Sequence, residues 1–271
     1  MTAAYSDFPE VPRVDWDAFK RGWRWNRGEH VTIVGPTGAG KTWLMTAILD
    51  RHPDVVALNL KPNDETLMER LPPSRWTYVP HWPPPQVYQD RPNWVVLKPK
   101  QRKLGENMAH QTRIVRYLFQ RIYDGPPGAK EQERGGWTIA IPDLSIILDD
   151  LKDGAKDANG KPKQTPAEQL RTIYKHGRGM RISLVIDGQT TAHLERLALD
   201  QPSHFFFFRP RDRDRAERMA EIGLGFKREV MAALESLQTC EACRTRSTRT
   251  AHLHEVLYVP SNGDMAITVP K

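Results

Sequence analysis

The chain has 271 residues, of which 39% are hydrophobic and 27% are charged, so it can bury a sizeable core as one large domain or two small ones. Its 40 basic and 33 acidic residues give a formal charge of +7, which is compatible with a polyanionic partner without requiring one. Two cysteines exclude a disulfide-rich secreted scaffold. No long apolar run and no N-terminal targeting signal is present, which predicts a cytoplasmic protein without a membrane segment of its own.

Residues 1–29 form a polar lead-in that is rich in aromatic side chains. Its tryptophans, Trp16, Trp23 and Trp25, suit either of two roles. They could stack on nucleic-acid bases, or they could pack beneath a sheet or over an adenine. Packing is the commoner role for an aromatic lead-in.

Residues 35–42 read Gly-Pro-Thr-Gly-Ala-Gly-Lys-Thr, a complete Walker A pattern between an apolar strand (30–34) and a helical run (43–49). Its glycines let the backbone curl with N–H groups pointing inward, which forms an anion nest at a helix N-terminus. Lys41 is then placed to reach the β- and γ-phosphates, and the Thr42 hydroxyl to ligate Mg²⁺. The alternative, a glycine-rich turn with a chance lysine, does not explain the flanking strand and helix. The pattern predicts binding of ATP with Mg²⁺ through Gly35, Pro36, Thr37, Gly38, Ala39, Gly40, Lys41 and Thr42.

Further apolar runs predict the rest of a sheet. Strands are expected at 55–60, 94–98, 137–141, 182–186 and 204–208, and helices at about 109–123, 167–176 and 211–222. The proline-rich residues 71–93 are expected to be an irregular surface excursion, and residues 152–166, rich in Lys, Asp, Gly and Pro, a mobile loop. An Asn-Gly turn within 261–264 predicts a hairpin of 256–259 and 265–269.

Strands that alternate with helices predict an α/β fold. We expect a P-loop NTPase of the RecA/ASCE-like kind, with a mostly parallel sheet, helices on both faces and a C-terminal β-hairpin. The expected domains are a lead-in (1–29), a P-loop ATPase core (30–225) and a C-terminal helix and hairpin extension (226–271).

A P-loop ATPase needs a carboxylate at the end of a neighbouring strand, where it holds Mg²⁺ through water or polarises the attacking water. Two candidates lie in one apolar stretch. Asp143 follows the strand at 137–141 and Pro142. Asp149 and Asp150 follow the apolar run 144–148, and could instead begin the polar loop as a solvated helix or turn.

An ordered series of motifs resembles the FtsK–HerA class of DNA-pumping P-loop ATPases, including phage-encoded members. The series comprises the Walker A region (28–42), the Lys61-Pro-Asn-Asp64 turn, the block from His176 to Gln189, and the strand 204–208 with the Arg/Asp-rich helix after it. The resemblance covers about residues 26–225. It implies a phage or mobile-element ATPase of the DNA translocase or packaging type.

In that class a strand like 137–141 runs directly into Asp-Glu. Here Pro142 stands where the resemblance places the Asp, and Asp143 where it places the Glu. We therefore take Asp143 as the surviving catalytic acid, with Asp149 and Asp150 as the alternative Mg²⁺ ligands. Nucleotide binding is expected to be secure, whereas the substitution by proline puts fast hydrolysis in doubt.

Two further polar residues have expected roles at the γ-phosphate. Gln189, at the carboxyl end of the strand 182–186, is placed to sense that phosphate or to orient water. Arg178, just past the helix 167–176, could reach the γ-phosphate of a neighbouring subunit, and Arg209 or Arg211 are weaker candidates for this role. Each could also be an ordinary polar surface residue.

Cys240-x2-Cys243 followed by His252-x-His254 has the residue types for zinc. The interval between Cys243 and His252 is short for a zinc finger. Two free thiols are therefore the favoured interpretation.

These observations favour an oligomeric ATP-hydrolysing motor, a homo-oligomeric ring such as a hexamer, that acts on duplex DNA. One alternative is an assembly or secretion ATPase of the same ancestry that acts on protein. Others are a nucleotide-gated clamp with weak hydrolysis and a small-molecule P-loop kinase, although no lid for a kinase is recognisable. The sequence specifies neither the biological process nor a DNA sequence preference.

Overall fold

The structure, a computed structural model, describes residues 10–125, 135–151, 154–157, 159–189, 197–222, 227–239 and 254–270. The chain divides into two units. The first comprises residues 1–25, 30–47 and 187–271, and the second residues 26–29 and 48–186. In the described ranges no helix combines the length and the apolar character that crossing a lipid bilayer would require.

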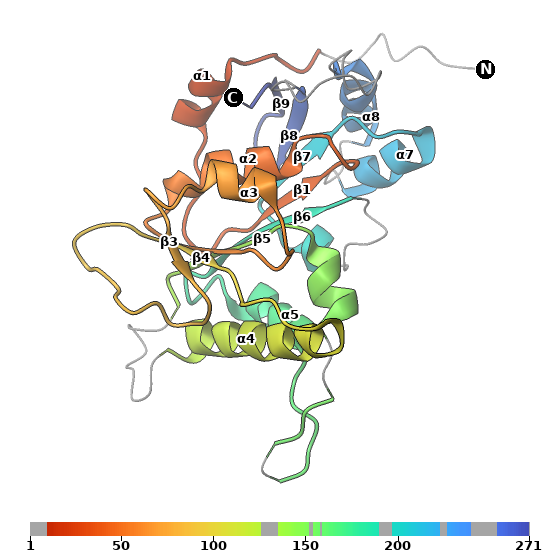
Figure 1. The fold of residues 1–271 in the computed structure, drawn as a ribbon. Helices are drawn as coiled ribbons and strands as arrows, with labels where there is room; N and C mark the ends of the chain where they lie inside the picture. Colours follow the sequence, from red (N-terminus) through yellow and green to blue (C-terminus); the bar gives the residue numbers. More distant parts are fainter. Residues whose placement is uncertain are drawn as a thin grey trace. The chain divides into compact units, whose positions relative to one another are not determined.

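The first unit contains strands in the order β1-β7-β8-β9 (Figure 1). The strands are β1 (Val31–Val34), β7 (His204–Phe208), β8 (Val256–Pro260) and β9 (Ala266–Thr268). Strands β1 and β7 are parallel, whereas β7–β8 and β8–β9 are antiparallel, so the predicted C-terminal hairpin is confirmed. The helices are α1 (Trp16–Gly22), α2 (Lys41–Ile48), α6 (Leu197–Asp200), α7 (Arg213–Ile222) and α8 (Lys227–Ser236).

The second unit contains strands in the order β3-β4-β2-β5-β6, and their pairings are all parallel. They are β2 (Asp54–Leu58), β3 (Thr77–Val79), β4 (Asn93–Leu97), β5 (Thr138–Ile141) and β6 (Ser183–Gly188), whose last two residues belong to the first unit. The helices are α3 (Glu65–Arg70), α4 (Leu104–Asp124) and α5 (Pro166–His176), with short helical segments at Leu49–Arg51 and Ile146–Asp150.

The prediction of a mostly parallel α/β sheet is confirmed. Strands β1, β5 and β6 are buried along their whole length, as is typical of parallel strands that are covered on both faces. The expectation that residues 71–93 are irregular throughout was wrong, because they contain β3. This edge strand is only three residues long and is stabilised by its pairing with β4, which a local sequence pattern cannot reveal.

Local signals fix the ends of the two long helices of the second unit. Helix α5 begins with a capping box, in which the Thr165 hydroxyl accepts from the Glu168 N–H and the Glu168 carboxylate accepts from the Thr165 N–H. The Thr165 N–H and the Thr165 hydroxyl both donate to the Glu168 carboxylate, and these two hydrogen bonds lower the pKa of Glu168. Helix α4 ends at Gly125, whose φ of 75° favours glycine.

The aromatic lead-in is part of the core of the first unit. Trp16, Trp23 and Trp25 are at most 8% exposed, so in this structure they pack inside the unit and do not present free faces for stacking on bases. Phe206 of β7 lies at the centre of this cluster, edge-on to the rings of Phe19 and Trp23. The lead-in therefore contributes apolar burial and ring contacts to the strands that carry the P-loop.

Replacing Phe206 with alanine tests this packing. Phe206 is 0% exposed, so Phe206→Ala should leave a cavity among the aromatic rings and lower the free energy of unfolding by about 3–5 kcal/mol. Tryptophan fluorescence during urea unfolding measures the effect. The exposed Arg228→Ala on α8 serves as the control and should change stability by about 0.5 kcal/mol or less. A loss below about 1 kcal/mol for Phe206→Ala would contradict this account of the core.

Candidate functional site

The P-loop, residues 35–42, connects β1 to α2 within the first unit. Its backbone is curled by a hydrogen bond from the Ala39 N–H to the Pro36 carbonyl (3.1 Å), and Gly38 and Gly40 have φ values of 82° and 94°. The Lys41 side chain is largely buried, and its ammonium donates to the Pro36 carbonyl at 3.2 Å. The lysine is thus held against the loop that is expected to enclose the phosphates.

Gly35 stands where β1 passes closest to β7. A Cβ at Gly35 would lie 2.7 Å from the Cβ of Phe208, so no other residue fits without displacing backbone. Val34 pairs with Phe207 in the parallel ladder, which brings Phe208 to the position opposite Gly35. The Gly35 N–H also donates to the Gly188 carbonyl at 3.2 Å. The first glycine of the loop is therefore fixed from two sides.

A cavity of about 550 Å³ borders the P-loop in the first unit. This volume lies in the range of small-molecule sites. One wall is the loop itself, and the rest comes from the end of β7, from Thr239 after α8 and from His254 and Glu255 before β8. The lining residues are Pro36, Thr37, Gly38, Ala39, Phe208, Arg209, Pro210, Arg211, Thr239, His254 and Glu255.

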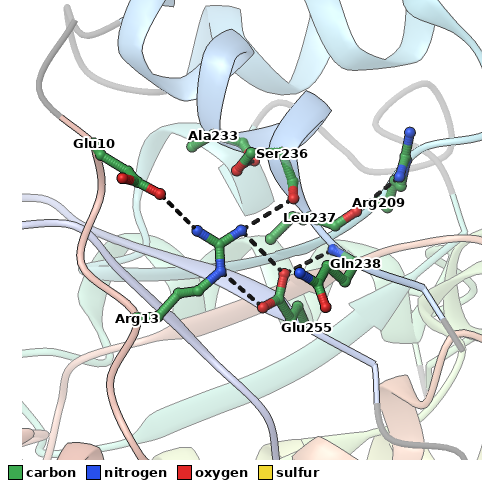
Figure 2. A network of polar contacts seen from close by, with 8 residues as sticks. All are labelled: Glu10, Arg13, Arg209, Ala233, Ser236, Leu237, Gln238 and Glu255. Carbon is green, nitrogen blue, oxygen red and sulfur yellow. Dashed lines mark hydrogen bonds and ion pairs between the residues drawn. The ribbon is translucent and has the colours of Figure 1, made fainter.

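A polar network holds this wall in place (Figure 2). The Glu255 carboxylate accepts from the Arg13 Nε at 2.9 Å and from the Gln238 N–H at 2.7 Å, and Arg13 also donates to the Ser236 carbonyl. The hydrogen bond from Arg13 to Glu255 raises the pKa of the Arg13 guanidinium. Glu255 is only 9% exposed, and a buried carboxylate is costly without such partners. The lead-in thereby fixes the residues that close the cavity.

Arg209 and Arg211 also line this cavity. The Arg209 guanidinium donates to the Leu237 carbonyl at 2.8 Å, which ties the end of β7 to the end of α8 (Figure 2). This contact gives Arg209 a structural role within its own subunit.

Gln189 belongs to the same unit as the P-loop. It directly follows Gly188, whose carbonyl accepts from Gly35, and its side chain is exposed. The exposed amide of Gln189 is therefore one residue away, along the chain, from the partner of Gly35.

Asp143 lies in the second unit, two residues after β5. Its φ of 65° is in the left-handed region, and the preceding Pro142 is buried. The carboxylate forms an ion pair with the Lys61 ammonium at 2.8 Å and accepts from the Ser145 hydroxyl. Because β2 and β5 are parallel neighbours, their carboxyl ends meet, and this brings Lys61 of the Lys/Asp turn to Asp143. Sequence reasoning named both segments but did not pair them.

Asp149 and Asp150 lie in the helical segment Ile146–Asp150 and not at the end of a strand. Leu144 and Ile147 are buried, so the apolar run before the two acids is one face of a helical turn. The Asp149 side chain is exposed. The segment is thus helical, and the role of these two acids as Mg²⁺ ligands stays a prediction.

Arg178 occupies the turn after α5 in the second unit and is exposed. Cys240, Cys243 and His252 lie outside the described residues, whereas His254 is buried and lines the cavity beside the P-loop. Among the residues that the structure describes, no group of three or more His, Cys, Asp or Glu side chains is arranged to hold a metal ion.

Sequence reasoning missed the cavity wall. Glu255 and its partner Arg13 are 242 positions apart, and neither belongs to a motif. Thr239, which also lines the cavity, belongs to no recognised sequence motif either. Only the strand order brings these segments to the P-loop.

The close contact at Gly35 can be tested directly. Gly35→Ala should push the loop away from Phe208 and abolish ATP binding while the unit stays folded. Gly22→Ala is the matched control, because a Cβ at Gly22 meets no atom within 4 Å, and it should bind ATP like the wild type. Isothermal titration with ATP and Mg²⁺ measures both. Normal affinity of Gly35→Ala would show that the loop does not depend on this contact.

Comparisons place this geometry in a known fold. No protein-family model matches the sequence, and none of the curated proteins matches it. Among solved structures, the DNA-packaging ATPase B204 from Sulfolobus Turreted Icosahedral Virus aligns over 91% of this chain and 98% of its own, with 13% identity and a TM-score of 0.52. B204 from Sulfolobus turreted icosahedral virus 2, the genome packaging NTPase in complex with AMPPCP, aligns over 91% and 99%, with 11% identity and a TM-score of 0.50. The likeness shows the fold: the chain has the P-loop NTPase fold of these structures, as the α/β pattern of its sequence predicted.

Proposed function

We propose that the protein binds and hydrolyses ATP and works as an oligomeric motor on duplex DNA. The observation that carries the proposal is the P-loop itself, curled between β1 and α2 and fixed against Phe208, with Lys41 folded onto it and a cavity of about 550 Å³ beside it. The likeness in fold to viral proteins described as DNA- or genome-packaging NTPases supports the choice of partner.

The residues of the P-loop suit the triphosphate of ATP. Inward N–H groups and the Lys41 ammonium offset the charge of the β- and γ-phosphates, and the partly exposed Thr42 hydroxyl is the residue that would hold Mg²⁺. A bound Mg²⁺ supplies further charge neutralisation at the phosphates. Gln189 would orient the attacking water, and Asp143 would accept its proton as the bond from the γ-phosphorus to the bridging oxygen breaks.

In an oligomeric ring, Arg178 would contribute to a neighbouring subunit's site. It is exposed and follows the end of α5, so it is accessible to a second copy of the chain. An added cation at the γ-phosphate would stabilise the charge that develops in the transition state. ATP hydrolysis would then depend on assembly.

One observation favours a second candidate function, a nucleotide-gated clamp with weak hydrolysis. Pro142 cannot supply the carboxylate that the resemblance places there, and Asp143 is engaged by Lys61 at 2.8 Å. An ammonium at this distance stabilises the ionised carboxylate. Such a site would bind ATP well and turn it over slowly.

The ATPase rate with and without duplex DNA tests the proposed function. Wild-type protein should hydrolyse ATP faster when duplex DNA is added, and the rate per subunit should rise with protein concentration as rings assemble. Lys41→Ala should lose ATP binding, because it removes the cation at the β- and γ-phosphates. ATP affinity in a folded Lys41→Ala variant equal to that of the wild type would refute the site, and a rate indifferent to DNA would point to the assembly ATPase.

Replacing the acidic residues distinguishes an ATP-hydrolysing motor from a nucleotide-gated clamp with weak hydrolysis. Asp143→Asn should lower turnover by roughly 10²–10⁴-fold if this carboxylate accepts the proton. Asp149→Asn, an isosteric change in the nearby helical segment, should leave turnover close to the wild-type value. A dead Asp149→Asn beside an active Asp143→Asn would reverse the assignment. Tight ATP binding without hydrolysis by the wild type would identify a clamp.

A further inference from the structure

Between the helical turn Ile146–Asp150 and α5, the described residues around Lys156 and Pro162 pair as a hairpin in the second unit. We call the described residues 154–157 and 159–163 the lysine hairpin. Lys156 pairs with Pro162 in an antiparallel bridge, and backbone hydrogen bonds join Asp157 to Lys161 and Lys163 to Ala155, each at 2.8 Å. In Figure 1 the hairpin extends away from α4 and α5. The described part of this segment, which the sequence predicted to be a mobile loop, contains a hydrogen-bonded turn.

Asp157 and Gly160 make that turn. The Asp157 Oδ1 accepts from the N–H groups of both Asn159 and Lys161 at 2.9 Å. Gly160 has a φ of 75°, in the left-handed region, and its N–H donates to the Asp157 carbonyl. The Asp157 carboxylate therefore accepts hydrogen bonds from the backbone of the turn. Within the described residues it forms no ion pair with a lysine.

The end of the hairpin that leads into α5 is anchored. The Gln164 carbonyl, directly after Lys163, accepts from the buried Arg116 of α4 at 2.8 Å, and Thr165 caps α5. Leu151, the last described residue before residue 154, is 1% exposed, and its N–H donates to the Ile146 carbonyl. The hairpin thus leaves the unit from a fixed backbone on the side of α5.

Three lysines are presented in this way. Lys156, Lys161 and Lys163 are exposed, and within the described part of the chain none of them forms an ion pair. Since side chains alternate along a strand and paired residues share a face, Lys156 projects on the side of Pro162, and Lys161 and Lys163 project on the other. The hairpin thus carries positive charge on both faces.

The positive charge continues onto α4. Lys163 lines a cavity of about 660 Å³ together with Arg113 and Arg116 of α4. Asp124 is the acidic residue of this lining. Arg113 and Lys163 are exposed, so the foot of the hairpin adds the charge of Arg113 to that of the lysines.

The composition of the segment identifies the kind of partner. Residues 152–164 contain no aromatic, no large aliphatic and no arginine side chain. They lack the anchors on which protein interfaces depend and the rings on which single-stranded bases stack. Lysines are suited to phosphates as point charges, and the major groove of a duplex admits a two-stranded ribbon with a phosphate row on each side.

We propose that the lysine hairpin is a contact surface for the phosphates of duplex DNA, with Lys156, Lys161 and Lys163 as its phosphate-binding residues. The proposal rests on the proposed function, for which it supplies the DNA-binding element. It places this contact in the second unit, between the acidic residues after β5 and helix α5.

The first experiment removes the lysines. The triple variant Lys156→Ala, Lys161→Ala and Lys163→Ala should bind a labelled duplex about 10²–10³-fold more weakly at 0.1 M salt, and its salt-dependence slope should fall by about three. Fluorescence anisotropy with an ATP analogue present, between about 50 and 200 mM salt, measures both. The control removes the same charge from other exposed lysines of the second unit, Lys100, Lys103 and Lys175, and should change affinity only a few-fold.

The second experiment compares two substitutions of Asp157 that remove the same charge but differ in whether they preserve the turn. Asp157→Asn and Asp157→Ala both remove one negative charge, but only asparagine keeps the oxygen that accepts from residues 159 and 161. Asp157→Asn should therefore bind duplex as tightly as the wild type or more tightly, and Asp157→Ala more weakly. Equal tightening by both would show that net charge alone matters, and would overturn the hairpin as a structured contact.

The remaining outcomes separate this inference from the proposed function. If the wild type binds duplex and the hairpin triple variant binds equally well, the inference fails while the DNA motor stands. If polyglutamate displaces the duplex as effectively as unlabelled duplex does, the surface serves an acidic protein and the inference fails. If the wild type binds no duplex even at low salt, both the inference and the DNA partner fail. Circular dichroism of each variant verifies that it is folded.

Discussion

The contact between Gly35 and Phe208 fixes the point at which the P-loop leaves β1. In the parallel ladder of β1 and β7, Val34 pairs with Phe207, so the next residue of β7 directs its Cβ at the point where the chain leaves β1. Only a residue without a side chain can begin the loop there, since a Cβ would approach Phe208 to 2.7 Å. The register of one strand pair thus determines where the phosphate loop starts and where Arg209 enters the cavity beside it.

The lead-in is part of the same site in physical terms. Its Trp23 and Phe19 contact Phe206 of β7, and its Arg13 neutralises Glu255 at the cavity wall. Removing one partner of such a pair leaves a buried charge unpaired, which costs more than the pair itself contributes. The unit that carries the P-loop is therefore built from three distant stretches of the chain, and its cavity wall depends on residues outside the Walker A motif.

Features that depend on neighbouring residues could be predicted from the sequence, whereas contacts between residues far apart in the chain could not. The strand–loop–helix of the P-loop, the capped helix α5 and the Asn-Gly hairpin are specified by neighbouring residues, and these were predicted. Strand β3 was missed, because it is stabilised by a partner strand and lies among prolines. The ion pair of Lys61 with Asp143 and that of Arg13 with Glu255 depend on which strands are neighbours, so composition and spacing gave no sign of them.

The connection from β5 to α5 brings the acidic residue and the lysine hairpin into one continuous segment. Asp143 is held by Lys61, Ile147 and Leu151 are buried, and the hairpin is anchored by Arg116 at its far end. Ile147 and Leu151 pack into the unit between Asp143 and the hairpin, so the helical turn that carries them is held in place by burial on the side of the acidic residue. Any other ligand of the Asp143 carboxylate would have to compete with its ion pair to Lys61.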